Sequence, residues 1–69
     1  MTIPEKIRLA LTYKHISESE LARRLGTTPS ALNQRMKTGK FTSEEIEKIA
    51  AILDAEFSFS FKFKDGTII

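Results

Sequence analysis

Hydrophobic residues in the first 54 positions recur at spacings of three and four, the period of an amphipathic α-helix. One of the expected helices starts at about Pro29, with Leu32 facing inward. The pattern predicts four short helices around one small core. The inner faces of the other three helices would carry Ile7, Ala10 and Leu11; Leu21, Ala22 and Leu25; and Ile46, Ile49, Ala50 and Leu53.

Polar residues mark the helix starts. Three helices show the capping-box pattern, in which a Ser or Thr cap is followed three residues later by Glu. The pairs are Thr2 with Glu5, Ser17 with Glu20, and Thr42 with Glu45. The remaining helix has Thr28 as its cap and Pro29 first, but carries Ala31 where the others have Glu. An acid there would stabilise the helix dipole. Its absence favours a helix start that approaches phosphates.

After Asp54 the period changes to two. Four phenylalanines, Phe57, Phe59, Phe61 and Phe63, alternate with Ser and Lys, and Asp65-Gly66 follows. Strict alternation predicts a half-buried β-strand, and Asp-Gly predicts a two-residue hairpin turn. The expected fold is therefore mainly α: a four-helix unit over residues 1–54, followed by a β-ribbon over 55–69.

Such a ribbon would leave a strand edge without a partner, and an exposed apolar edge invites pairing. We expect two copies to join through this strand as a homodimer. The expected interface residues are Phe57, Phe59, Phe61, Phe63 and Ile68. The alternative is a ribbon folded onto its own helices.

Composition narrows the class of protein. The chain has 69 residues, enough for one domain, and no cysteine for disulfides or thiolate metal sites. Its apolar runs are far shorter than the roughly 20 residues that span a membrane. Glu5, Lys6 and Arg8 interrupt the N-terminal apolar residues, unlike a signal peptide. We expect a cytoplasmic protein.

Charge is segregated along the chain. Residues 23–40 hold five basic residues and no acid, whereas residues 41–56 hold five acids against one lysine. A basic block beside an acidic one is typical of a one-sided surface for a polyanion, although a segregated solvated surface gives the same pattern.

The basic block contains two expected helices joined by Gly26-Thr27-Thr28, the spacing of a helix-turn-helix motif (about residues 18–37). Asn and Gln can hydrogen-bond adenine, Ser can bond several bases, and Lys can reach guanine or phosphate. The second helix therefore offers base-reading chemistry to double-stranded DNA. Its expected outward residues are Thr28, Pro29, Ser30, Asn33, Gln34 and Lys37.

The stretch SESELARRLGTTPSALNQRMKTGK resembles the helix-turn-helix of the phage repressor and Cro class of XRE-like transcription regulators. The terminal FSFKFKDGTII is also similar to Cro, in which C-terminal strands pair in the dimer. The resemblance implies a lambda-repressor-like domain that binds an inverted-repeat operator as a dimer, most simply as a repressor.

By position, the resemblance implies that Ser30, Asn33 and Gln34 contact bases, with Thr28 and Lys37 at the margins. It places phosphate contacts at the start of the first motif helix and after the second, and the basic block supplies further cations. The expected phosphate-binding residues are Ser17, Ser19, Arg23, Arg35 and Lys40.

Three positions depart from the family pattern. Glu18 stands where the family often has Gln, and its carboxylate should weaken a phosphate contact. Pro29 replaces a common base-reading Gln. Arg35 occupies a position that is often apolar, so Met36 is expected to take over the packing.

The residues do not favour an enzyme. His15 is the only histidine, and no nucleophile motif, metal site or cofactor-binding loop is evident. The cluster of Glu44, Glu45 and Glu47 is typical of helix-dipole compensation. The alternative function is a protein-interaction module, antitoxin-like or inhibitor-like, whose Phe-rich strand binds a partner. RNA binding is less favoured, because no aromatic residues interleave the basic ones.

Overall fold

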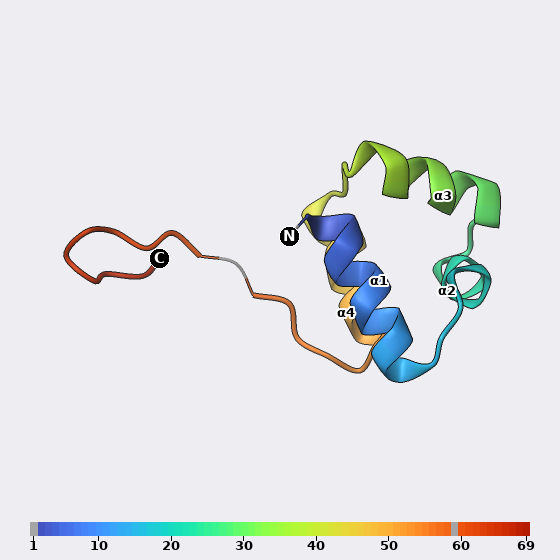
Figure 1. The fold of residues 1–69 in the computed structure, drawn as a ribbon, viewed down its shortest axis with the longest axis horizontal. Coiled ribbons are helices and arrows are strands. Elements are labelled where there is room, and N and C mark those ends of the chain that lie inside the picture. The colour runs from blue at the N-terminus through green and yellow to red at the C-terminus, as the bar shows by residue number, and fades with distance from the viewer. Residues whose placement is uncertain (1, 59) are drawn as a thin grey trace.

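The computed structural model describes residues 2–58 and 60–69. It contains four α-helices: α1 (Ile3–Lys14), α2 (Glu18–Leu25), α3 (Pro29–Thr38) and α4 (Ser43–Ile52). The four predicted helices are therefore confirmed. They form a body, residues 3–55, from which residues 56–58 and 60–69 extend as an arm (Figure 1).

The predicted helix caps are largely confirmed. Thr2 and Thr42 form complete capping boxes with Glu5 and Glu45. At α2 the box is half formed: Ser17 Oγ accepts the Glu20 N–H at 3.0 Å, but the Glu20 carboxylate turns to Arg23 and Arg24 instead. At α2 two guanidiniums compete for the Glu20 carboxylate, and a charged donor bonds it more strongly than a backbone amide does.

The core lies where the predicted faces of the helices meet. Leu21 and Ala22 of α2 are completely buried at its centre, and α2 packs against both α3 and α4. Met36 is only 3% exposed, so it does take the packing position beside the more exposed Arg35. The buried hydrophobic residues of this core are Ile7, Leu11, Leu21, Ala22, Leu32, Met36, Ile49 and Leu53.

The predicted C-terminal β-ribbon is wrong. Within the described part of residues 55–69 there is no β-strand, only an isolated antiparallel bridge between Lys62 and Ile68. The chain does turn at Asp65-Gly66: the N–H of Phe63 donates to the Thr67 carbonyl at 2.8 Å, and the N–H of Ile69 donates to the Phe61 carbonyl at 2.8 Å.

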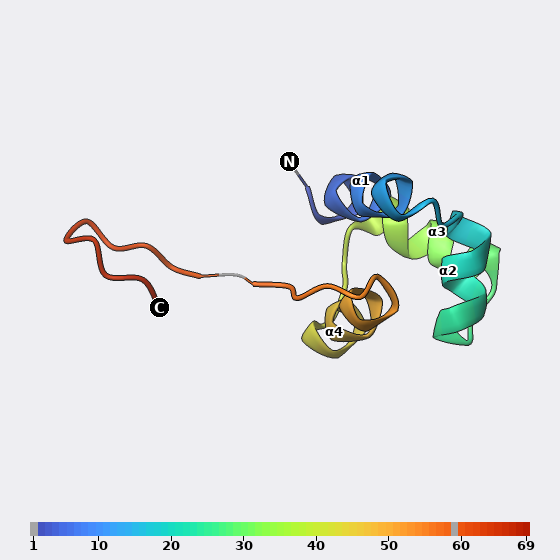
Figure 2. The ribbon, with the colours of Figure 1, turned by 90° about the horizontal axis from the view of Figure 1, so that it is seen from below.

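The physical reason is the position of the arm. It projects away from the helices (Figure 2), so its described backbone lies beside no further strand of the described chain, and an isolated two-stranded hairpin is marginal. Of the predicted dimer residues, Phe57, Phe61, Phe63 and Ile68 lie exposed on this arm, and Phe59 lies outside the described residues.

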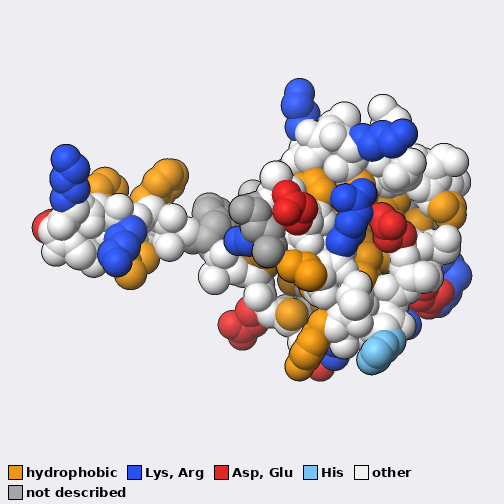
Figure 3. Space-filling view, in the orientation of Figure 1, with side chains coloured by type: hydrophobic (Ala, Val, Ile, Leu, Met, Phe, Trp, Pro, Cys, Tyr) orange, Lys and Arg blue, Asp and Glu red, His pale blue; other side chains and the backbone are white. Residues whose placement is uncertain are grey.

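The projecting arm makes the molecule elongated, with extents of 44 × 23 × 20 Å. Figure 3 shows hydrophobic side chains and lysines together on the surface of the arm. Glu56 and Phe57 lie against α1 and α4, but the described residues after them project away from the helices. The alternative interpretation, a ribbon folded onto its own helices, is therefore not seen in the described part of the chain. In the described part of the chain, no helix has the length and apolar character needed to cross a membrane.

Candidate nucleic-acid interface

The turn between α2 and α3 forms as its residues predict. Gly26 ends α2 in the left-handed conformation, with φ of 76°. The N–H of Thr27 then donates to the Ala22 carbonyl at 2.9 Å. Thr28 starts α3, because its Oγ1 accepts the Ala31 N–H at 3.1 Å. The short turn therefore joins α2 and α3 directly, and the two helices pack against each other.

The outward face of α3 is polar. Leu32 and Met36 anchor the helix in the core, whereas four residues on the opposite side are exposed. At about 100° per residue, these four fall within an arc of about 100°. They are Ser30, Asn33, Gln34 and Lys37, all among the predicted base-reading residues. We call them the α3 face.

The start of α3 also lacks an acid, whereas the first turns of α1, α2 and α4 each contain one or two. Pro29 and Thr28 are exposed at this end. The positive end of the α3 dipole is therefore not offset by a carboxylate of its own helix.

An open groove of about 330 Å³ brings part of the predicted site together. It is lined by Ser19 and Glu18 at the start of α2 and by Pro29, Ser30 and Asn33 of α3. A predicted phosphate-binding residue thus lies beside three predicted base-reading residues. Ser17 is exposed two residues before Ser19, where its hydroxyl caps α2.

Gln34 lies at the opposite edge of the α3 face from Asn33. It lines a second groove, between α3 and α4, together with Arg35 and Lys48. The structure therefore separates the predicted base-reading residues into two groups. Ser30 and Asn33 face the start of α2, and Gln34 faces the start of α4.

The cations of the basic block are less free than the sequence indicates. Arg23 and Arg24 both pair with Glu20, Arg24 Nε at 2.9 Å from its carboxylate. Hydrogen bonds from Arg23 first, and then from Arg24, lower the pKa of Glu20 from 4.5 to about 2. This carboxylate, from outside the block, offsets part of its positive charge.

Arg35 is also engaged. Its guanidinium pairs with Glu45, donates from Nε to the Lys40 carbonyl at 3.0 Å, and lies 5.7 Å from the Phe41 ring centroid. It joins the end of α3 to the start of α4. The pKa of Glu45 is lowered, chiefly by the Thr42 N–H and also by Arg35. Arg35 is therefore placed as a positioning residue for the α3–α4 loop.

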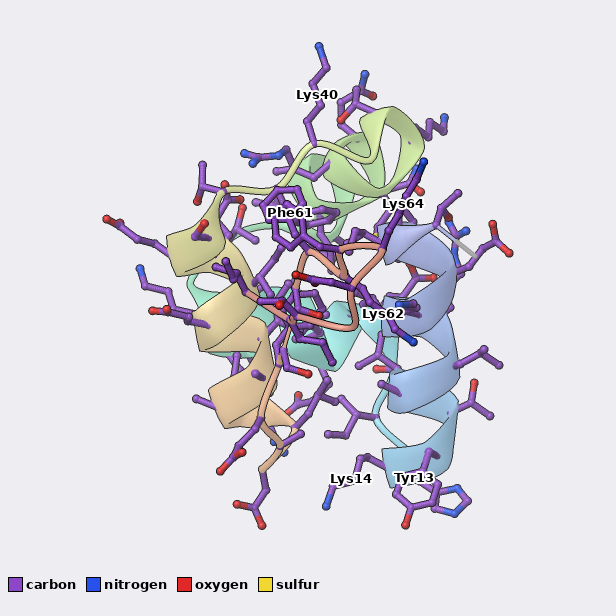
Figure 4. The ribbon with its side chains drawn as sticks, turned by 90° about the vertical axis from the view of Figure 1, so that its left-hand side faces the viewer. Tyr13, Lys14, Lys40, Phe61, Lys62 and Lys64 are labelled. Atoms are coloured by element: carbon purple, nitrogen blue, oxygen red, sulfur yellow. The ribbon has the colours of Figure 1, made fainter. Side chains whose placement is uncertain are left out.

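Two lysines of the block remain available. Among the described residues, neither Lys37 nor Lys40 has an ion-pair partner, and both are exposed. Lys40 projects from the α3–α4 loop away from the helices (Figure 4). These two lysines lie at and just beyond the C-terminal end of α3.

Glu18 is the one acid in the groove with Ser19. Its carboxylate lies 4.0 Å from Arg8 Nε of α1, at the edge of ion-pair distance. A carboxylate here opposes a phosphate, and Arg8 only partly offsets it because both side chains are about half exposed.

The carboxylates that offset the basic block were not part of the sequence-based site. Glu20 could have been found, because it precedes Arg23 and Arg24 by three and four residues, the helical pairing distance. Glu45 could not, because it lies ten residues from Arg35 and meets it only through the fold.

No metal-binding group of three or more His, Cys, Asp or Glu side chains occurs among residues 2–58 and 60–69. In comparisons with known proteins, no family model matches the chain, and no curated protein or solved structure is significantly similar to it. The likeness to the phage repressor and Cro class therefore stays a prediction from the residues of the helix-turn-helix stretch.

Proposed function

We propose that this protein is a sequence-specific, double-stranded DNA-binding transcription regulator that represses by occupying its operator. The observation that carries the proposal is the α3 face: exposed Ser, Asn, Gln and Lys side chains on a short helix held by a tight turn against α2. The acid-free helix start lies at one end of this face.

The expected contacts divide by chemistry. Asn33 and Ser30 would read base edges in the major groove, each good contact contributing roughly 1–3 kcal/mol of discrimination. Lys37 and Lys40 would supply salt-dependent affinity for phosphates, without sequence preference. Ser19, beside Ser30 in the same groove, would position the DNA backbone.

A repressor of this size would gain affinity and specificity by binding as a pair. Two copies related by a two-fold axis would read an inverted repeat, with half-site centres about one helical turn apart. Occupancy of such an operator would block access by the transcription machinery.

Selection from a random duplex DNA pool at about physiological salt tests the proposal. We expect an enriched inverted repeat. A single enriched half-site would support sequence-specific DNA binding but contradict binding as a two-fold pair. No enrichment by protein with a normal helical spectrum would contradict DNA reading.

Two single substitutions sharpen the test. Asn33→Ala is expected to weaken binding to the selected site by roughly tenfold or more, and binding to random DNA very little. Lys40→Ala is expected to weaken both equally and to reduce the salt dependence by about one phosphate contact. An equal loss on both DNAs for Asn33→Ala would remove Asn33 from the readout.

One observation favours a second function. The arm exposes Phe61, Phe63 and Ile68, which suits a protein-interaction module. Such a module would not need the α3 face, so it becomes the better account if the pool selection yields no enriched sequence.

A further inference from the structure

Arg35, in the last turn of α3, contacts three partners along the α3–α4 loop, residues 39–42. Its guanidinium pairs with Glu45 of α4, and its Nε donates to the Lys40 carbonyl at 3.0 Å. Its Cζ lies 5.7 Å from the centroid of the Phe41 ring. One planar group therefore meets a carboxylate, a carbonyl and a ring at once, and joins the end of α3, the loop and the first turn of α4.

The carboxylate that Arg35 meets is itself fixed by the cap of α4. Glu45 Oε1 accepts the Thr42 N–H at 3.1 Å and also accepts a hydrogen bond from the Arg35 guanidinium. The Thr42 hydroxyl accepts the Glu45 N–H at 3.1 Å in return. Because both bonds of this capping box are made, Glu45 is a fixed anchor to which Arg35 ties the loop.

The helices leave the loop to be held by side chains. α2 packs against both α3 and α4, and an open groove of about 370 Å³ lies between α3 and α4. Arg35 and Glu45 both line this groove, so their ion pair spans it. The hydrogen bond from the Lys40 N–H to the Thr38 hydroxyl is long, at 3.4 Å. The bond from Arg35 to the Lys40 carbonyl, at 3.0 Å, is the shorter one.

We propose that Arg35 is a positioning residue for the proposed DNA binding, on which this role rests: it holds the loop so that Lys40 meets a phosphate, and it makes no phosphate contact itself. The Lys40 side chain points away from the helices (Figure 4), whereas its carbonyl is held by Arg35. A backbone fixed at this residue limits where the ammonium can reach, so less conformational freedom is lost when a phosphate is bound.

The contacts of Arg35 explain why it does not bind the phosphate directly. Its side chain is 42% exposed, but Nε and one terminal nitrogen already donate to Lys40 and Glu45. A phosphate that approached the guanidinium would also be repelled by the Glu45 carboxylate. Lys37 and Lys40, in contrast, have no ion-pair partner among the described residues. The basic block therefore contains one cation that positions and others that bind.

Folding of the body does not depend on these contacts. The ion pair is partly exposed, and pairs of this kind contribute little to the free energy of unfolding. Leu32 and Met36, each 3% exposed, anchor α3 in the core instead. Variants at Arg35 are therefore expected to keep the helical spectrum and a thermal midpoint within about 5 °C of the unmodified chain. Order in the loop can thus be tested separately from folding.

NMR relaxation of the full chain without DNA tests the restraint directly. In the unmodified chain we expect heteronuclear NOE values at Lys40 and Phe41 close to those of α3, the sign of an ordered backbone on the picosecond to nanosecond timescale. Arg35→Lys should lower both values clearly, because an ammonium cannot replace the planar guanidinium in three contacts at once. Unchanged loop values in Arg35→Lys would overturn the inference, whether or not the protein binds DNA.

Fluorescence anisotropy with the selected duplex and a random-sequence duplex, over a series of salt concentrations, separates positioning from direct contact. Arg35→Lys and Lys40→Ala should each weaken binding to both duplexes roughly three- to tenfold and lower the salt slope by about one contact. The double variant should bind no more weakly than Lys40→Ala alone, because Arg35 acts through Lys40.

Two results of the binding series would contradict the role of Arg35. A phosphate contact made by Arg35 itself would survive as a lysine contact, so unimpaired binding by Arg35→Lys would overturn the inference. Losses that multiply in the double variant would do the same, because Arg35 would then act through a group other than Lys40.

Two neighbouring acids of α4 give a matched pair of variants. In Glu45→Gln the amide oxygen can still accept the Thr42 N–H, so the cap is kept while the charged partner of Arg35 is removed. Glu44 is exposed and has no ion-pair partner among the described residues, so Glu44→Gln removes an acid without touching the loop.

The two variants should change DNA binding in opposite directions. Loss of an acid ordinarily favours a polyanion, so Glu44→Gln should leave binding unchanged or tighten it up to about twofold. Glu45→Gln should instead weaken binding about twofold or more and lower the NOE at Lys40, since Arg35 loses its charged anchor. Tightening by Glu45→Gln equal to that by Glu44→Gln would count against the inference.

The role of Arg35 and the proposed function fail in different experiments. A protein that selects a DNA sequence and binds it equally well as Arg35→Lys would keep the proposed function and overturn the role of Arg35. A folded protein that binds no duplex DNA would overturn the proposed function and, with it, the positioning of Lys40 for a phosphate. The NMR comparison would then still decide whether Arg35 orders the loop.

Discussion

The helical body and the arm are both strongly patterned in sequence, yet among residues 2–58 and 60–69 only those of the body form regular secondary structure. In the body, Leu21 is completely buried, whereas Phe61 on the arm is 70% exposed. A helix forms its backbone hydrogen bonds within one segment, so periodicity and caps are enough to specify it. A strand needs another strand beside it, so alternation only offers a face and an edge. The arm has the pattern of a strand without the neighbour.

Shortening a large apolar side chain should show the largest difference between the body and the arm, measured as loss of unfolding free energy. Leu21→Ala is expected to cost about 2–5 kcal/mol of unfolding free energy, a large part of the stability of so small a domain. Phe63→Ser on the arm should cost under about 0.5 kcal/mol in dilute, monomeric protein. Urea denaturation followed by far-UV circular dichroism measures both. A similar loss from both would show that the arm packs on the body.

Replacing a glycine by alanine should also destabilise the body more than the arm, but the difference in unfolding free energy should be smaller. Gly26 ends α2 at φ of 76° and Gly66 turns the arm at φ of 91°. Gly26→Ala should cost about 1–2 kcal/mol, because alanine is strained in the left-handed region. Gly66→Ala should leave the helical denaturation unchanged and shift only the NMR amide signals of residues near 63–67. A lower thermal midpoint for Gly66→Ala would contradict this separation.

The smallest expected difference between the body and the arm is in how a carboxylate of each affects stability at acidic pH. Hydrogen bonds from Arg23 and Arg24 lower the pKa of Glu20 to about 2 in the folded body. A carboxyl whose folded pKa is lowered stabilises the fold above its ordinary pKa, 4.5 for Glu20, and that contribution is lost as pH falls from about 4.5 to about 2. The thermal midpoint of the body should therefore fall across this range.

Glu20→Gln should flatten that fall slightly, and a pH dependence equal to that of the unmodified chain would contradict a role for Glu20. On the arm, the Thr67 N–H lowers the pKa of Asp65. Asp65→Asn should not change the thermal midpoint at any pH, because no helix depends on that turn.

Much of the helix-turn-helix stretch was predictable from sequence, and the reason is local chemistry. Thr28, Pro29 and Gly26 fix where α3 starts and α2 ends, and the spacing of Leu32 and Met36 sets which side of α3 turns outward. The charge of the site was less predictable. Five basic residues in one block appeared free, but three of them are paired with two glutamates from outside it.

The sequence by itself determined the four helices, their caps and the polar α3 face, because helical hydrogen bonds and amphipathic periodicity act within a few residues. Only the tertiary structure decided that Arg35 meets Glu45, that Ser19 shares a groove with Asn33, and that α1 and α4 leave an apolar groove between them. It also decided that the arm forms no strand in its described part, because a strand depends on an edge that no local pattern supplies.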